Sequence, residues 1–114
     1  MGAEWTVPVD HTPFDLSAAS EQAANTLVAA CLAAAAAGEI SAYFDLGVAY
    51  STGSHGAPVD LIEAHKWFNL AAVAGYEDAA QCRADVSEEM TAREVAEAQR
   101  RAREWLAAGS RRAA

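Results

Sequence analysis

Two cysteines and three histidines are the side chains in this 114-residue chain whose chemistry suits nucleophilic catalysis or metal binding. His55, Asp60 and His65 recur at five-residue intervals, and imidazole and carboxylate groups are common ligands of zinc. Asp60, however, is placed to cap the helix that begins after it, and His65 adjoins an alanine of the same helix. The sequence therefore predicts no metal site and no cofactor.

Cys31 and Cys82 both lie on apolar stretches of predicted helices. A thiol becomes a nucleophile in an exposed, positively charged environment, whereas most of this chain is acidic. The sequence has no C-x-x-C pair and no His/Cys cluster with the spacing of metal ligands. We expect two buried, reduced thiols in a cytoplasmic protein, and no enzymatic activity.

Signals for phosphate or nucleic-acid binding are weak as well. The segment 53–56 reads G-S-H-G between two predicted helices and lacks the lysine of a phosphate-binding loop. The basic side chains of the last helix have no aromatic residues between them. We expect them to pair with glutamates at helical spacing rather than to bind nucleic acid. The arginines are Arg93, Arg100, Arg101 and Arg103, and the glutamates are Glu94, Glu97 and Glu104.

The formal charge of −8 is distributed unevenly along the chain. Residues 1–90 hold 13 acidic side chains against Lys66 and Arg83, whereas residues 91–114 hold six arginines against three glutamates. An acidic body repels nucleic acid and anionic membranes, and it suits a basic partner. The same charge also keeps a protein soluble, and the sequence leaves both interpretations open.

The composition predicts an all-α fold with a single domain at 16–109. Alanine, the best helix former, makes up roughly a quarter of the chain, and no segment alternates polar and apolar residues with period two. Residues 1–15 contain two prolines and apolar side chains, which predicts an extended N-terminal arm. Residues 110–114 are expected to form a frayed C-terminus.

Five helices are expected within the domain, at 16–37, 40–52, 61–74, 77–89 and 92–108. Two of them begin with capping-box patterns, Asp60 with Glu63 and Thr91 with Glu94. Gly47 falls in the middle of the second helix, where glycine costs about 1 kcal/mol relative to alanine. We therefore expect another helix to approach closely at Gly47.

The segment 27–38, L-V-A-A-C-L-A-A-A-A-A-G, is the most apolar part of the chain. It begins too far along the chain for a signal peptide, and acids rather than basic residues precede it. It is also too short to span a bilayer. We assign it to the first helix of the domain and expect no membrane partner.

Three glycines, each following an alanine-rich helix end, mark a period in the sequence. Gly38 and Gly75 are 37 residues apart, and Gly75 and Gly109 are 34 residues apart. Periods of this size are typical of stacked helix pairs. The pattern predicts an α/α superhelix, a short solenoid of about five helices, with one complete pair between capping helices.

Residues 42–79 resemble a Sel-like (Sel-one-like) repeat, a helical repeat related to the tetratricopeptide repeats. The family pattern begins A-x-x-x-L-G-x-x-Y-x-x-G and continues G-V-x-x-D-x-x-x-A-x-x-W-[YF]-x-x-A-A-x-x-G-x-x-x-A. In this chain the loop at 53–60 is one residue longer and Ala57 replaces the valine. The C-terminal part also resembles the ending of many bacterial members. The matching residues are Ala42, Leu46, Gly47, Tyr50, Gly53, Gly56, Asp60, Ala64, Trp67, Phe68, Ala71, Ala72, Gly75 and Ala79.

The resemblance implies an adaptor whose binding surface is the concave face made by the first helix of each pair. Carried onto this sequence, that face is a small apolar patch beside an acidic stripe, which suits a peptide with an apolar anchor and a nearby Lys or Arg. In the opposing interpretation, Phe44 is covered by the first helix or the arm, and the acids are only solvated. The implied partner-binding residues are Ser41, Phe44, Val48, Ser51, Asp78, Gln81, Asp85 and Glu88.

Two functions follow as hypotheses. The first is a non-enzymatic protein–protein interaction module, an adaptor that binds a protein or peptide on the concave face. The alternative is a homo-oligomeric structural protein, in which Trp5 and Phe14 of the N-terminal arm dock on a neighbouring copy.

Overall fold

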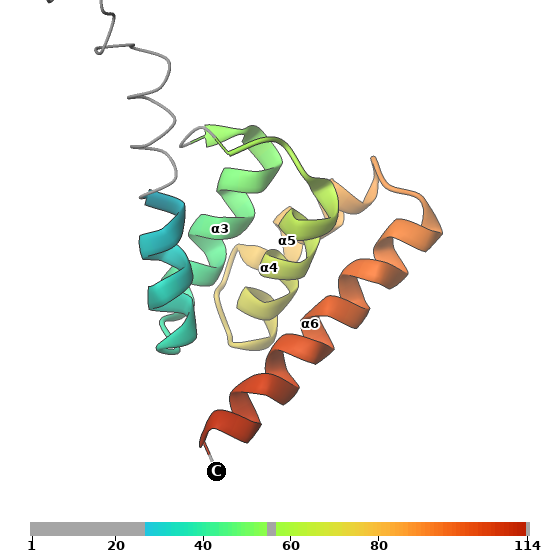
Figure 1. The fold of residues 1–114 in the computed structure, drawn as a ribbon. Coiled ribbons are helices and arrows are strands. Elements are labelled where there is room, and N and C mark those ends of the chain that lie inside the picture. Colours follow the sequence, from blue (N-terminus) through green and yellow to red (C-terminus); the bar gives the residue numbers. More distant parts are fainter. Residues whose placement is uncertain (1–26, 55–56, 114) are drawn as a thin grey trace, which may run out of the picture.

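Every regular element in the described residues is helical, which confirms the predicted all-α fold. The computed structural model describes residues 27–54 and 57–113, with side chains in the last helix described up to residue 109. Residues 27–36 are helical and come first (Figure 1). Four labelled helices follow: α3 (Ile40–Thr52), α4 (Leu61–Val73), α5 (Ala79–Ser87) and α6 (Ala92–Ala113).

Helix α4 is the centre of the arrangement. Helices α3, α5 and α6 each pack against it, and α6 forms one edge of the molecule (Figure 1). A helix with neighbours on several sides must be apolar around most of its circumference. The residues that α4 buries are Ala64, His65, Trp67, Phe68, Leu70 and Ala71.

A first hydrophobic cluster joins α4 to α3, α6 and the helical residues 27–36. Trp67 lies at its centre and is 1 % exposed. Its ring is stacked with Tyr43 at a centroid distance of 6.0 Å and meets Trp105 edge-on at 4.9 Å. Aromatic pairs of this geometry contribute about 0.5–1.5 kcal/mol each beyond the burial of their area. The contact between Trp67 and Trp105 therefore helps to hold α6 against α4.

A second cluster, built on Ala64, Phe68 and Val86, joins α4 to α3 and α5. Phe68 lies directly over Gly47 of α3: a β-carbon at Gly47 would be 2.5 Å from Cδ1 of Phe68. The absence of a side chain at Gly47 is what admits the ring. The close helix approach predicted at this glycine is therefore confirmed.

The two predicted capping boxes differ. At α6 the box is complete, because Thr91 Oγ1 accepts the backbone N–H of Glu94 at 3.1 Å and Glu94 Oε1 accepts that of Thr91 at 2.8 Å. At α4 only half is present. Asp60 Oδ1 accepts the backbone N–H of Glu63 at 3.1 Å, but the N–H of Asp60 donates to the carbonyl of Tyr50 at 2.9 Å. The Glu63 carboxylate is thereby free for contacts with other helices.

The predicted end of the last helix is wrong. Helix α6 continues through Gly109 to Ala113, into the residues that were expected to be frayed. Gly53 and Gly75 adopt positive φ angles of 76° and 101° where the chain turns toward the next helix. Gly109 lies inside a helix and has no atom near its missing side chain. Gly109 is therefore not equivalent to Gly75, so only Gly38 and Gly75 of the three regularly spaced glycines follow the end of a helix.

The other boundaries agree more closely with the sequence. The structure has α3 at the predicted residues, whereas α5 is shorter than the predicted 77–89 by two residues at each end. The start of the predicted first helix, at 16, and the N-terminal arm, at 1–15, lie outside the described residues.

Candidate functional site

The α3 half of the predicted surface is partly built into the core. Phe44 and Val48 pack against the cluster of Phe68. The Phe44 ring lies 5.5 Å from that of Phe68 and is stacked on Tyr76 at 4.4 Å, with an interplanar angle of 13°. Phe44 is half-buried by these contacts. The contact with Tyr76 holds α3 against the turn after α4, and the part of Phe44 that stays accessible is available to a ligand.

The two serines on the same face of α3 differ in their surroundings. Ser41 is exposed in the first turn of the helix. Ser51 is half-buried, and its Oγ donates to the carbonyl of Val48 at 3.2 Å. This bond satisfies the hydroxyl within its own helix. Ser41 is therefore the serine whose hydroxyl faces solvent.

The α5 half of the surface is exposed and acidic. The Nε2 amide of Gln81 donates to Oδ1 of Asp85 at 2.9 Å, which orders one carboxylate on the surface. Asp85 and Asp78, after burial, raise the pKa of the Cys82 thiol, so both carboxylates lie around it. The exposed residues on this face are Asp78, Gln81, Asp85 and Glu88.

One hydrophobic cluster joins the two halves of the predicted surface. Phe44 and Val48 of α3 pack against it, and so does Cys82 of α5. Because Asp78 and Asp85 flank Cys82, the apolar patch and the acidic residues border the same cluster. Of the predicted residues, Phe44 and Val48 thus contact the Phe68 cluster directly, whereas Asp78 and Asp85 lie near it only through Cys82.

The cysteines and His65, for which no catalytic role was predicted, are at least partly buried. Both cysteines are free and half-buried, rather than fully buried as expected. Burial and, to a lesser extent, Asp45 raise the pKa of the Cys31 thiol. His65 is 3 % exposed, and its Nδ1 has no hydrogen-bond partner. Burial, with a smaller effect of Arg83, lowers the pKa of His65.

The described residues contain no group of three or more His, Cys, Asp and Glu side chains arranged to hold a metal ion. Of the set considered from the sequence, Asp60 caps α4 and His65 is buried in it. His55 lies outside the described part of the chain.

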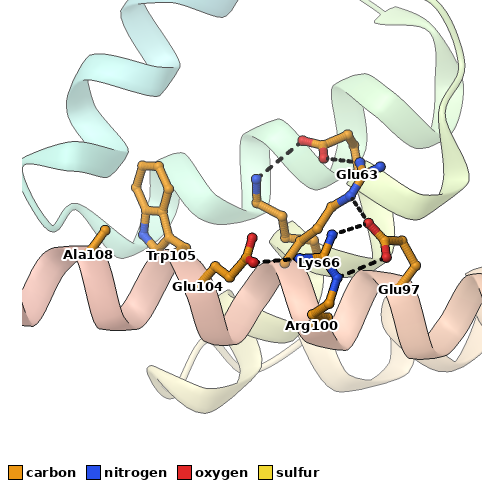
Figure 2. Close-up of a pocket in the computed structure, with 8 residues that line it drawn as sticks. Glu63, Lys66, Glu97, Arg100, Glu104, Trp105 and Ala108 are labelled. Atoms are coloured by element: carbon orange, nitrogen blue, oxygen red, sulfur yellow. Dashed lines mark hydrogen bonds and ion pairs between the residues drawn. The ribbon is translucent and has the colours of Figure 1, made fainter.

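A groove between α4 and α6 was not predicted from the sequence. Its volume is about 480 Å³, and Glu63 lies at one end of it (Figure 2). The Glu63 carboxylate accepts hydrogen bonds from Nε1 of Trp67 at 3.2 Å, from Nζ of Lys66 at 3.4 Å and from Nη1 of Arg101 at 2.7 Å. The groove is lined by Glu63, Lys66, Glu97, Arg100, Arg101, Glu104, Trp105 and Ala108.

The charges along this groove compensate one another. Arg101 also donates to Glu97 at 2.7 Å, and Arg100 binds both Glu97 and Glu104. The two guanidinium groups lower the pKa of Glu97 to about 2. The Nζ of Lys66 lies 4.3 Å from the ring centroid of Trp67. The charged side chains that line the groove therefore carry no net charge, and they link α4 to α6.

The predicted pairing of arginines with glutamates on the last helix is confirmed for Arg100 and Arg101. Arg93 and Arg103 are exposed and form no ion pair with any described residue. Glu94 instead caps its own helix. Helical spacing could reveal the pairs within α6, but no local signal links Glu63 to Arg101 across 38 residues.

Comparison with known proteins adds no relative. No protein-family model, no curated protein and no solved structure matches the chain. The resemblance of residues 42–79 to a Sel-like repeat therefore stays a prediction. None of the helices in the described residues has the length and hydropathy needed to cross a bilayer. The alternative of assembly through Trp5 and Phe14 falls on residues outside those described and also stays a prediction.

Proposed function

We propose that this chain is a non-enzymatic interaction module, an adaptor that binds a peptide or protein on the surface formed by α3 and α5. One observation carries the proposal: the stacked rings of Phe44 and Tyr76 are only half-buried, and Phe44 packs on the same cluster as Cys82, which Asp78 and Asp85 flank. A side chain already held by its own protein loses little entropy when a ligand covers it. It is therefore suited to be an anchor point.

The chemistry of the surface defines the ligand. The half-buried ring of Phe44 suits an apolar side chain, which would extend the hydrophobic cluster around Phe68. The carboxylates of Asp78 and Asp85 suit a Lys or Arg placed close to that side chain. We propose a basic peptide with one apolar anchor, met in the cytoplasm, where thiols such as Cys31 and Cys82 stay reduced.

The packing of α3 on α4 supports the repeat interpretation that lies behind this proposal. We propose that α3 and α4 are one Sel-like unit of a short α/α superhelix, with α5 starting the next unit. Gly47, where the pattern has its glycine, is the residue that admits Phe68. Asp60, where the pattern has its aspartate, caps α4. A fold alone does not assign a function, so the surface rather than the repeat carries the proposal.

A peptide titration tests the proposal on the whole chain. One set of short peptides carries Leu or Phe beside Lys or Arg, and a matched set has Glu in place of the basic residue. The backbone amide signals of Phe44, Val48 and Asp85 are followed by nuclear magnetic resonance. We expect them to shift with the basic set only. Equal shifts with both sets, or none with either, would contradict the proposal.

Two matched charge variants locate the binding surface. Asp85→Lys removes a carboxylate from the proposed surface, and we expect it to weaken peptide binding about tenfold. Asp45→Lys makes the same charge change at an exposed position of α3 whose carboxylate lies near Cys31. It should bind the peptides like the wild type. An equal loss in both variants would mean that overall charge, and not this surface, governs binding.

A further inference from the structure

The outward face of α6 carries a row of basic side chains that matches the acidic face of α5. Both rows follow spacings of three, four and three residues, which keep side chains on one face of a helix. Each row spans ten residues, or about 15 Å along its helix axis. The acidic row consists of Gln81 and Asp85 of α5 together with Asp78 and Glu88, which directly precede and follow α5 in the right-handed helical conformation, and all four are exposed. The basic row consists of the exposed residues Arg93, Ala96, Arg100 and Arg103.

Most charges of the two rows have no ion-pair partner among the described residues. Arg93 and Arg103 form no ion pair with any described residue, and the same holds for Asp78 and Glu88. Arg100 pairs with glutamates of its own helix, yet its side chain is 49 % exposed. Helix α6 packs on α4 with its other face, where Ala98 and Ala102 are buried. The basic row therefore faces solvent.

We propose that the basic row of one copy binds the acidic row of a second copy. This rests on the proposed function, because it assigns a cationic helix as an occupant of the α5 half of the same surface. When the two helices lie side by side in parallel, every acid of one row faces an arginine of the other. The remaining position sets Gln81 opposite Ala96, whose small side chain lets the helices approach closely.

The assembly that follows is open or cyclic. The two rows are different surfaces, so the contact is heterologous, and each pair of copies retains one unused acidic row and one unused basic row. Exposed ion pairs are individually weak and are screened by salt. The net charge of −8 also opposes association. Self-association should therefore be weak near physiological ionic strength and absent at about 1 M salt, where the Debye length is about 3 Å.

Sedimentation equilibrium of the full chain tests this at both ionic strengths. We expect the average mass to rise with protein concentration at the lower ionic strength and to remain that of a monomer at the higher. Glu88→Arg and Arg103→Glu should each weaken association about tenfold. The double variant exchanges the two charges and should recover most of the loss. An equimolar mixture of the two single variants should associate more strongly than either alone.

Asp45→Arg is the matched control, because Asp45 is exposed on α3 and belongs to neither row. A wild type that is monomeric at every concentration overturns the inference, as does an unchanged association in Arg103→Glu. Failure of the proposed function remains distinguishable. Arg103→Glu leaves the α5 surface intact, so it should still bind basic peptides when its self-association is lost. A chain that associates as described but binds no peptide would retain the inference and lose the proposed peptide site.

Discussion

Gly47 and Phe68 set the distance between α3 and α4. The ring of Phe68 occupies the space where a side chain at position 47 would begin, with Cδ1 at 2.5 Å and Cγ at 2.9 Å from an ideal β-carbon. The ring is 2 % exposed and lies against Phe44, so it has little room to move. The surface proposed to bind a peptide therefore depends on a glycine in the middle of a helix.

Gly47→Ala should destabilise the protein although alanine is the better helix former. The gain in helix propensity is about 1 kcal/mol. Forcing a methyl group against a buried ring costs about 1–3 kcal/mol in a well-packed core, and here the overlap with Phe68 is severe. We expect a net loss of about 1–2 kcal/mol in the free energy of unfolding by urea denaturation.

Gly109→Ala is the matched control for this prediction. Gly109 also lies within a helix, but apart from the neighbouring helix backbone no atom lies within 4 Å of the position of its β-carbon. The same substitution there should leave the stability unchanged or raise it by up to about 1 kcal/mol. A loss at Gly109 as large as that at Gly47 would mean that contact with Phe68 is not the cause.

Glu63→Ala should be the most destabilising change in the α4–α6 groove. It removes the acceptor of Trp67 Nε1, on a side chain that is 1 % exposed, together with the partner of Arg101. A buried donor left without a partner costs about 1–3 kcal/mol. Glu63→Gln retains an acceptor for Trp67 and should lose less. Thermal and urea denaturation of both variants measure the difference.

Arg100→Ala provides the comparison for this groove. Its guanidinium group bonds only to glutamates of its own helix, on an exposed surface. Exposed pairs of this kind are screened by solvent and contribute little to stability, so Arg100→Ala should lose far less than Glu63→Ala. A stability loss in Arg100→Ala equal to that in Glu63→Ala would show that the groove charges act collectively, and that the Trp67 contact has no special weight.

Local signals in the sequence were enough to predict most helices and several of their ends. Asp60 caps α4 as predicted, and Gly53 ends α3 in the left-handed conformation. Such signals act within a few residues, so they can be found without the structure. The helix end predicted at Gly109 was wrong because that prediction also used local sequence alone. Glycine ends a helix only where the chain turns, and the residues around Gly109 do not reveal whether the chain turns there.

The candidate site was predictable only in part. The family resemblance implied one surface for Phe44, Val48 and Asp85, and in the structure Phe44 and Val48 pack on one cluster while Asp85 is exposed. It could not reveal the stack of Phe44 on Tyr76, because that contact depends on how α3 and the turn after α4 meet. Because of this stack, Phe44→Ala should cost stability as well as binding, which makes charge variants on α5 the cleaner probe.

Both thiols should react more slowly in the native chain than in the unfolded one. The thiolate is the reactive form, and burial together with nearby acids raises the pKa of Cys31 and of Cys82. We expect iodoacetamide at mildly alkaline pH to modify both residues slowly, and urea to accelerate the reaction. Asp45→Asn should accelerate the modification of Cys31 only. Mass spectrometry of tryptic peptides reports each site separately, and equal rates in native and unfolded protein would contradict the raised pKa values.

The stability should decrease as the pH falls below about 6.5, because of His65. Burial and Arg83 lower its pKa in the folded state from the ordinary value of 6.5. Within the interval between the two pKa values, the unfolded chain binds a proton that the folded chain does not. The free energy of unfolding therefore rises with pH in this window. The stability that the neutral His65 contributes is lost as the pH falls through the same window.

His65→Gln tests this assignment, because glutamine is polar but does not titrate. Its free energy of unfolding should change less between pH 7 and pH 5 than that of the wild type, as measured by urea denaturation at a series of pH values. Arg83→Met removes the second cause and should reduce the pH dependence partially. It also breaks the bond from Arg83 to Asn69 at 2.6 Å, so its overall stability falls at every pH. If the slope in His65→Gln equalled that of the wild type, the acid sensitivity would belong to other groups.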